Sequence, residues 1–181
     1  MMSPAFPRTL LLLAFLAAAM TAPAQDLPKV KGIAHYVVFQ KPPEGVETVE
    51  YDTFQFPQLG LITKEPPLVL DGIRSARMNM AAIKASNVQE RTRQSYGQPA
   101  ITIVLNDENT AKLREFSQQY KGQQVLIAVD GIPVSAPMML SPIEEGIVTI
   151  SGGNRTPEQM KEVLDMILEY QELPSAQPAG E

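Results

Sequence analysis

The hydrophobic pattern is clearest in the second half of the chain, where the period of a strand and that of a helix follow each other. Residues 101–105 alternate as a half-buried strand does, and Asn106 then stands where a helix N-cap is expected. Apolar residues between 113 and 120 recur at helical spacing, and Gly122 is placed to end that helix. Residues 125–129 are apolar throughout, which predicts a central strand covered on both faces.

A turn, a strand and a second helix complete this pattern. An Asp-Gly pair at 130–131 predicts a tight turn, and residues 147–150 have the composition of a strand. Thr156, Pro157 and Gln159 form a capping box, and an apolar stripe at helical spacing follows them. The order β-α-β-β-α predicts an α+β fold of ferredoxin-like type, in which a largely antiparallel sheet carries two helices on one face.

The segments before this core have a weaker pattern. Residues 25–66 are rich in proline, although residues 33–39 have the composition of a strand. Because proline confines strands to sheet edges, we interpret 25–66 as an arm of edge strands or extended chain. Residues 73–76 predict a short helical turn and residues 77–82 a strand. The polar residues 84–98 predict a long exposed connection.

The two ends of the chain predict processing and disorder. Arg8 precedes an apolar run at residues 10–20, and Ala-Pro-Ala at 22–24 has the pattern of a cleavage site before Gln25. The run is shorter than the roughly 20 residues of a membrane span, so we expect a cleaved signal peptide and a periplasmic or secreted protein without a membrane span. The predicted organisation is a signal peptide at 1–24, an arm at 25–66, a main α+β domain at 67–174 and a disordered tail at 175–181.

Composition narrows the classes of partner and of chemistry. The chain has 15 basic and 20 acidic residues and a formal charge of -5, which argues against nucleic acid or anionic lipid as the main partner. It has no cysteine and a single histidine, His35, which excludes disulfides and His/Cys metal sites. We therefore expect no metal and no cofactor. An enzyme would need carboxylates such as Asp130 and Glu144 to converge, and Ser135 lacks a partner histidine in a suitable motif.

One segment is a candidate for polypeptide binding. Prolines at positions 133 and 137 favour an extended backbone in this segment, and the methionines that follow have adaptable side chains. The candidate binding residues are Val134, Ser135, Ala136, Pro137, Met138, Met139 and Leu140. The same methionines would serve equally as core residues. The Ser-Gly-Gly-Asn turn at 151–154 resembles an anion cradle, but the capping box after it already uses that helix end.

Several short sequence words resemble one known family. They are Leu-Ile-Ala-Val-Asp-Gly at 126–131, Val-Ser-Ala-Pro at 134–137 and Ile-Ser-Gly at 150–152, followed by the capped helix start at 156–159. In this order and spacing they resemble the head subdomain of the first periplasmic domain of SecD, a membrane protein that assists protein export. Arg155 departs from the pattern, because the family usually has phenylalanine there.

The resemblance implies a non-enzymatic binding module that contacts polypeptide during or after export. SecD has a membrane bundle that carries proton-coupled work, and this chain has no such bundle, so the resemblance does not imply a translocation motor. The alternative is an accessory subunit that docks on a particular folded envelope protein through the arm or through residues 84–98. The sequence specifies neither the partner nor the oligomeric state.

Overall fold

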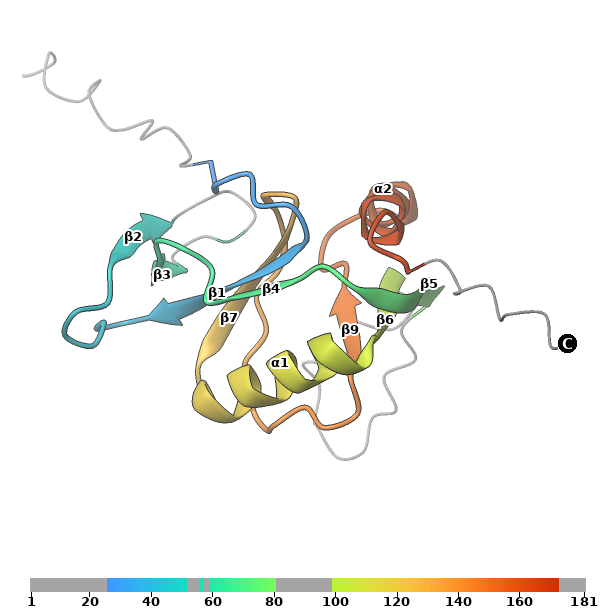
Figure 1. Cartoon of the computed structure of the whole chain (residues 1–181). Helices are drawn as coiled ribbons and strands as arrows, with labels where there is room; N and C mark the ends of the chain where they lie inside the picture. Colours follow the sequence, from blue (N-terminus) through green and yellow to red (C-terminus); the bar gives the residue numbers. More distant parts are fainter. Residues whose placement is uncertain (1–25, 52–55, 57–58, 81–98, 173–181) are drawn as a thin grey trace, which may run out of the picture.

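The computed structural model describes residues 26–51, 56, 59–80 and 99–172 (Figure 1). The predicted signal peptide, the polar connection at 84–98 and the tail at 175–181 lie outside the described residues. The described elements, in chain order, are β1 (Ile33–Phe39), β2 (Thr48–Tyr51), β3 (Gly60–Thr63), β4 (Leu68–Leu70), β5 (Ile73–Met80), β6 (Pro99–Leu105), α1 (Asp107–Gln119), β7 (Gln124–Val129), β8 (Ile132–Ser135), β9 (Ile147–Ser151) and α2 (Pro157–Leu168).

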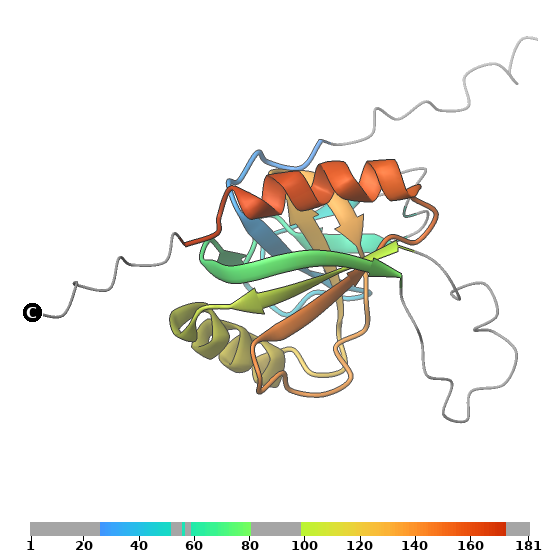
Figure 2. The same ribbon diagram turned by 90° about the vertical axis from the view of Figure 1, so that its right-hand side faces the viewer.

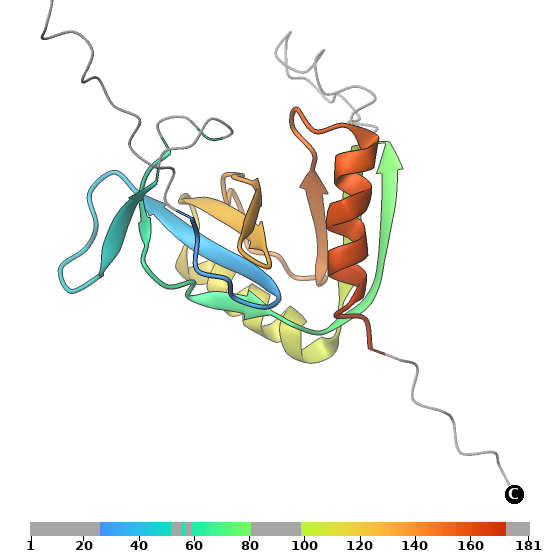
Figure 3. The same cartoon turned by 90° about the horizontal axis from the view of Figure 1, so that it is seen from above.

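The strands form two antiparallel sheets, which Figure 3 shows from above. The first sheet has the order β2-β3-β1-β7-β8, with β4 paired to β1, and the second has the order β5-β6-β9. Figure 2 shows α2 lying along β5 and β6 of the second sheet. The predicted α+β class with antiparallel pairing is confirmed, with the strands divided between two sheets.

Strands β1 and β7 form the centre of the first sheet, and their side chains alternate between two hydrophobic clusters. On one face, Ile33 and Val125 join a main core that also contains Phe116 of α1 and Met160 of α2. On the other face, Tyr36 joins a second core covered by residues such as Leu27 and Tyr51. Both faces of β7 are therefore covered, as its continuous apolar run predicts.

The position of β1 differs from the predicted edge. All seven residues of Ile33–Phe39 are buried, and the strand lies between β3 and β7. The prolines that suggested an edge lie outside the strand, so every residue of β1 keeps its N–H for the ladder. The boundary at residues 66 and 67 stays a prediction, although β1 pairs with β4 across it.

The predicted helical turn at 73–76 is wrong, because these residues open β5. Ile73 is fully buried and Ala76 pairs with Ile103 of β6. A bulge between Ile73 and Ser75 interrupts the alternation at the point where the sequence was misleading. Pairing with a neighbouring strand therefore decides the conformation here against the local pattern.

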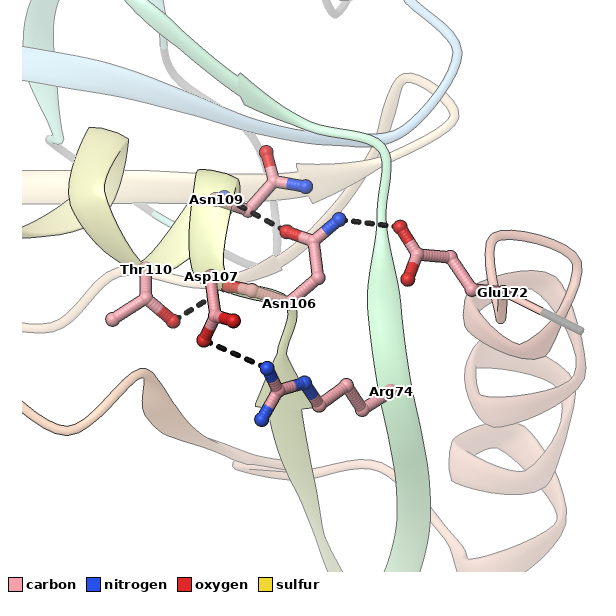
Figure 4. Close-up of polar contacts among 6 residues, drawn as sticks. All are labelled: Arg74, Asn106, Asp107, Asn109, Thr110 and Glu172. Atoms are coloured by element: carbon pink, nitrogen blue, oxygen red, sulfur yellow. Dashed lines mark hydrogen bonds and ion pairs between the residues drawn. The ribbon is translucent and has the colours of Figure 1, made fainter. Parts of the chain in front are cut away.

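Both predicted helix starts are confirmed. Thr156 accepts from the Gln159 N–H and the Gln159 side chain accepts from the Thr156 N–H, which is a complete capping box. At α1, the Asn106 Oδ1 accepts a hydrogen bond of 2.8 Å from the Asn109 N–H (Figure 4). The Asn106 Nδ2 also donates to Glu172 beyond α2, at 2.5 Å, so one side chain caps α1 and contacts the segment after α2.

Replacing Asn106 by alanine should lower the free energy of unfolding by about 1 kcal/mol, because the cap of α1 is lost. Asn106→Ser should recover most of this loss, because serine is also a good helix cap. The recovery should be incomplete, because a serine side chain is too short to reach Glu172. Urea unfolding monitored by circular dichroism measures both variants. Equal stability of the alanine variant and the parent protein would contradict the role of the cap.

Candidate functional site

A cavity of about 640 Å³ lies beside β8, at the edge of the first sheet. One wall is β8 with the residues that follow it, and the other is the turn between β9 and α2. The lining residues are Phe56, Leu59, Gln124, Val134, Ser135, Ala136, Pro137, Ser151, Gly152, Gly153, Asn154, Arg155 and Gln159. We call this cavity the groove. Its lining combines apolar side chains with hydroxyl, amide and guanidinium groups.

The structure divides the predicted binding segment. Residues 134–137 line the groove. Met138 and Leu140 are 52% and 76% exposed beside it. Met139 is 8% exposed and belongs to the main core, where its N–H donates to the Gln123 carbonyl. A ligand on the surface therefore does not reach Met139, whose side chain is held in the core by the alternation of an extended chain.

Side chains donate to carbonyl groups of β8 and of the residue that follows it. The Arg155 guanidinium donates to the Val134 carbonyl at 2.9 Å and to the Pro133 carbonyl at 2.5 Å. The Gln124 side chain donates to the Ala136 carbonyl at 3.0 Å. Burial lowers the pKa of Arg155, but its ordinary value is so high that the side chain stays charged. Arg155 thus links the start of α2 to the edge of the first sheet.

The turn before α2 depends on its glycines. A Cβ on Gly152 would lie 2.9 Å from the Pro99 carbonyl oxygen and 2.9 Å from the Met160 Cγ. Gly153 has a φ of +58°, a conformation that side chains rarely adopt. The capping box at Thr156 and Gln159 uses N–H groups of the first turn of α2, next to the turn that borders the groove.

His35 and Asp130 lie away from the groove lining. His35 is buried in β1 with its ring edge against Phe116, and burial lowers its pKa to about 4. Asp130 lies in the β7–β8 turn, where its Oδ1 accepts from the Gly32 N–H at 3.0 Å and from the Tyr170 hydroxyl at 2.5 Å. Burial, followed by this bond to Asp130, raises the pKa of Tyr170.

The two carboxylates that an enzyme would need to converge, Asp130 and Glu144, have separate partners. Glu144 pairs with Arg114 of α1, whereas Asp130 bonds to Gly32 and Tyr170. In the described part of the chain, no group of three or more His, Asp or Glu residues could hold a metal ion. Neither α1 nor α2, the helices of the described ranges, has the length and apolar character of a membrane span.

Sequence reasoning missed the groove residues that come from distant segments. Phe56 and Leu59 precede β3, and Gln159 lies in α2, yet all three line the groove with residues 134–137. Leu59 belongs to a short apolar run, which was the available signal. Nothing local indicates that this run meets β8, because a contact between distant segments is set by the sheet order.

No family model matches the chain. The SecD protein translocase subunit of Sebaldella termitidis is 38% identical over 86 residues, which are 48% of this chain and 18% of that protein. The SecD subunit of Dictyoglomus turgidum is 34% identical over 65 residues, which are 36% of this chain and 16% of that protein. The matches therefore span less than a fifth of these relatives.

Two solved structures share the fold. One is a crystal structure of SecDF in a super-membrane-facing form, with a TM-score of 0.51 and 19% identity over 78% of this chain and 19% of that chain. The other is a structure of SecDF described as a membrane component that enhances protein export, with a TM-score of 0.51 and 18% identity over 82% of this chain and 68% of that chain. The chain is thus similar to part of SecD in sequence and to part of SecDF in fold, which confirms the resemblance seen in its sequence motifs.

Proposed function

We propose that this protein is an exported, SecD-like module that holds extended polypeptide outside the cytoplasmic membrane and performs no chemistry on it. The observation that carries the proposal is the groove, because residues 134–137 of the predicted binding segment form one of its walls. The likeness to SecD supports a role in protein export. The signal peptide expected at residues 1–24 supports the same location.

The groove suits an extended chain for two reasons. Phe56 and Leu59 supply apolar contacts, while Ser135 and Asn154 supply polar groups that can bond to a peptide backbone. Its exposed neighbours Met138 and Leu140 extend the apolar surface, and methionine adapts to side chains of different shape. Such a surface is expected to bind many different sequences with low affinity, and not one sequence with high affinity.

A bulky side chain inside the groove should prevent binding. Ala136 is half-buried in the groove wall, so Ala136→Phe should weaken binding of a carboxymethylated, permanently unfolded secreted protein by about tenfold or more. The matched control is Ala111→Phe, which adds the same side chain at an exposed position of α1. Fluorescence anisotropy measures binding, and NMR titration of the parent protein locates it.

The NMR titration decides whether the proposal stands. The amide signals of residues 134–140 should shift when the unfolded protein is added. If these residues give no shift at saturating concentrations, or if the two phenylalanine variants bind alike, the groove does not hold polypeptide and the proposed function is wrong.

A further inference from the structure

Strand β5 is an edge strand of the second sheet, and the hydrogen bonds of β6 set the phase of its backbone. The Leu105 N–H donates to the Gly146 carbonyl at 2.9 Å, so the odd-numbered residues of β6 face β9 and the even-numbered ones face β5. Arg77 and Asn79 pair with even-numbered residues and therefore bond to β6. The N–H and C=O groups that point away from β6 belong to Ala76, Met78 and Met80.

The molecule itself pairs with the start of this edge. The Ile73 N–H donates to the Tyr170 carbonyl at 3.1 Å, and the Glu172 N–H donates to the Ile73 carbonyl at 3.0 Å. Among the described residues, no strand pairs with the part of the edge that follows, and Figure 3 shows β5 at the outer margin of the molecule. The edge thus accepts an extended chain where one is present, and its longer part is open to another.

The two faces of the open part differ in character. Ala76 and Met78 lie opposite core residues of β6, so their side chains are on the face that α2 covers. Met78 is nonetheless 38% exposed. Arg77 and Asn79 are exposed on the other face, where the Asn79 side chain donates to the Thr102 hydroxyl at 3.2 Å. An added strand would therefore meet an apolar side and a polar, positively charged side.

A second copy of β5 matches this pattern. In an antiparallel pair about a two-fold axis at Met78, that residue faces its own counterpart, and Ala76 faces Met80 of the second copy. All three residues with free backbone groups then pair with one another. On the polar face, Arg77 lies opposite Asn79 of the second copy, so no two like charges are directly opposed.

The neighbouring registers are less favourable. A register centred on Arg77 would place two guanidinium groups directly opposite each other, which destabilises a strand pair. A register centred on Ala76 would bring position 79 of the second copy to Ile73, whose outer groups already pair with residues 170–172. The charges and the occupied start of the edge therefore select the register centred on Met78.

We propose that the partner of β5 is β5 of a second copy of this chain, in an antiparallel pair centred on Met78. The pair would join two three-stranded sheets into one continuous sheet with both α2 helices on the same face. The exposed Met78 side chains would meet at the axis and lose contact with water. The proposal goes beyond the proposed function, since no residue of β5 lines the groove.

Single cysteines test the register, because the parent chain has none. In the proposed pair, positions 77 and 79 of the two copies have Cα atoms about 4.5 Å apart, a separation that a disulfide can span. An oxidised mixture of Arg77→Cys and Asn79→Cys should therefore form heterodimers in excess of random pairing, as measured by mass spectrometry. A predominant homodimer of Arg77→Cys would contradict the register.

A charge at the axis tests the contact itself. Sedimentation velocity of the parent protein should show a monomer–dimer equilibrium with a dissociation constant of about 10 to 100 μM, as expected for a small interface. Met78→Lys should weaken the dimer about fivefold to tenfold, because two ammonium groups would meet across the strand pair. The matched control is Val46→Lys, at a position that is 37% exposed outside β5, and it should dimerise like the parent protein.

Three results would overturn the proposal. The first is a parent protein that stays monomeric at about 1 mM. The second is equal dimerisation of the two lysine variants, which would place the contact elsewhere. The third is a monomer whose Met78→Lys variant binds the unfolded secreted protein more weakly than Val46→Lys does, which would show that the edge holds polypeptide instead. Ala136→Phe tests the proposed function separately, in the groove.

Discussion

Alanine at position 146 is expected to lower the free energy of unfolding by about 2 to 4 kcal/mol, the largest effect predicted for a single methyl group in this protein. Gly146 has a φ of +65°, which is unfavourable for any residue with a Cβ. The added Cβ would also lie 2.1 Å from the Thr110 Oγ1 and 2.9 Å from the Thr110 Cγ2. Thr110 cannot rotate freely, because its hydroxyl donates to the Asn106 carbonyl at 2.7 Å.

Two controls separate the backbone strain from the collision. Gly45 has a φ of +82° with nothing within 4 Å of its virtual Cβ, so Gly45→Ala carries the strain alone and should cost about 1 to 2 kcal/mol. In a Thr110→Ala background, the cost of Gly146→Ala should fall toward the same value. Chemical unfolding of the parent protein and of the four variants (two single glycine variants, Thr110→Ala and the double variant) gives these costs. Equal costs for Gly146→Ala and Gly45→Ala in the parent protein would show that Thr110 does not restrict the site.

Acidification from pH 7.5 to pH 5 is expected to remove about 2 kcal/mol of stability through His35 alone. His35 is 2% exposed, and burial lowers its pKa from 6.5 to about 4 in the folded protein. Between these two values the unfolded chain binds a proton at this residue and the folded chain does not. Stability is therefore complete above about pH 6.5 and falls as the pH drops, with the loss from this residue levelling off below pH 4 at about 3 kcal/mol.

His35→Leu should remove this part of the pH dependence. The leucine variant keeps an apolar side chain of similar volume in the buried position, so its free energy of unfolding should change less than that of the parent protein between pH 7.5 and pH 5. The difference between the two slopes isolates His35 from the carboxylates, which titrate in both proteins. Parallel slopes would mean that the folded protein accommodates a charged His35.

Local signals predicted the helices of this protein well. The capping box at Thr156 and the cap at Asn106 each involve residues within a stretch of four, so the local sequence is enough to predict them. Both are present in the structure. The central position of β1 in its sheet could not be predicted from the local sequence, because it depends on pairing with β7, far along the chain. Ile73 entered a strand instead of a turn for the same reason, since its partner lies in β6.

The groove was predictable only on one side. Residues 134–137 were identified from their extended, proline-bounded sequence and from their likeness to SecD, and they line the groove. Met139 could not be separated from its exposed neighbours by composition, because methionine is equally suited to core and surface. Arg155 was recognised as a departure from the family pattern, but its bonds to the β8 carbonyls depend on how two sheets meet.

The bonds of Asp130 to Gly32 and Tyr170 have a consequence for the order in which the protein folds. Gly32 meets Asp130 across 98 positions of sequence, and Asp130 meets Tyr170 across 40. Strand β1 likewise has to wait for β7 before its main ladder can form. A chain made from its N-terminus can therefore pair β1 with β3 and β4 early, but the β7 side of β1 stays open until residue 129 has been synthesised. Until then the nascent chain has an unpaired edge on what becomes the central strand of the first sheet.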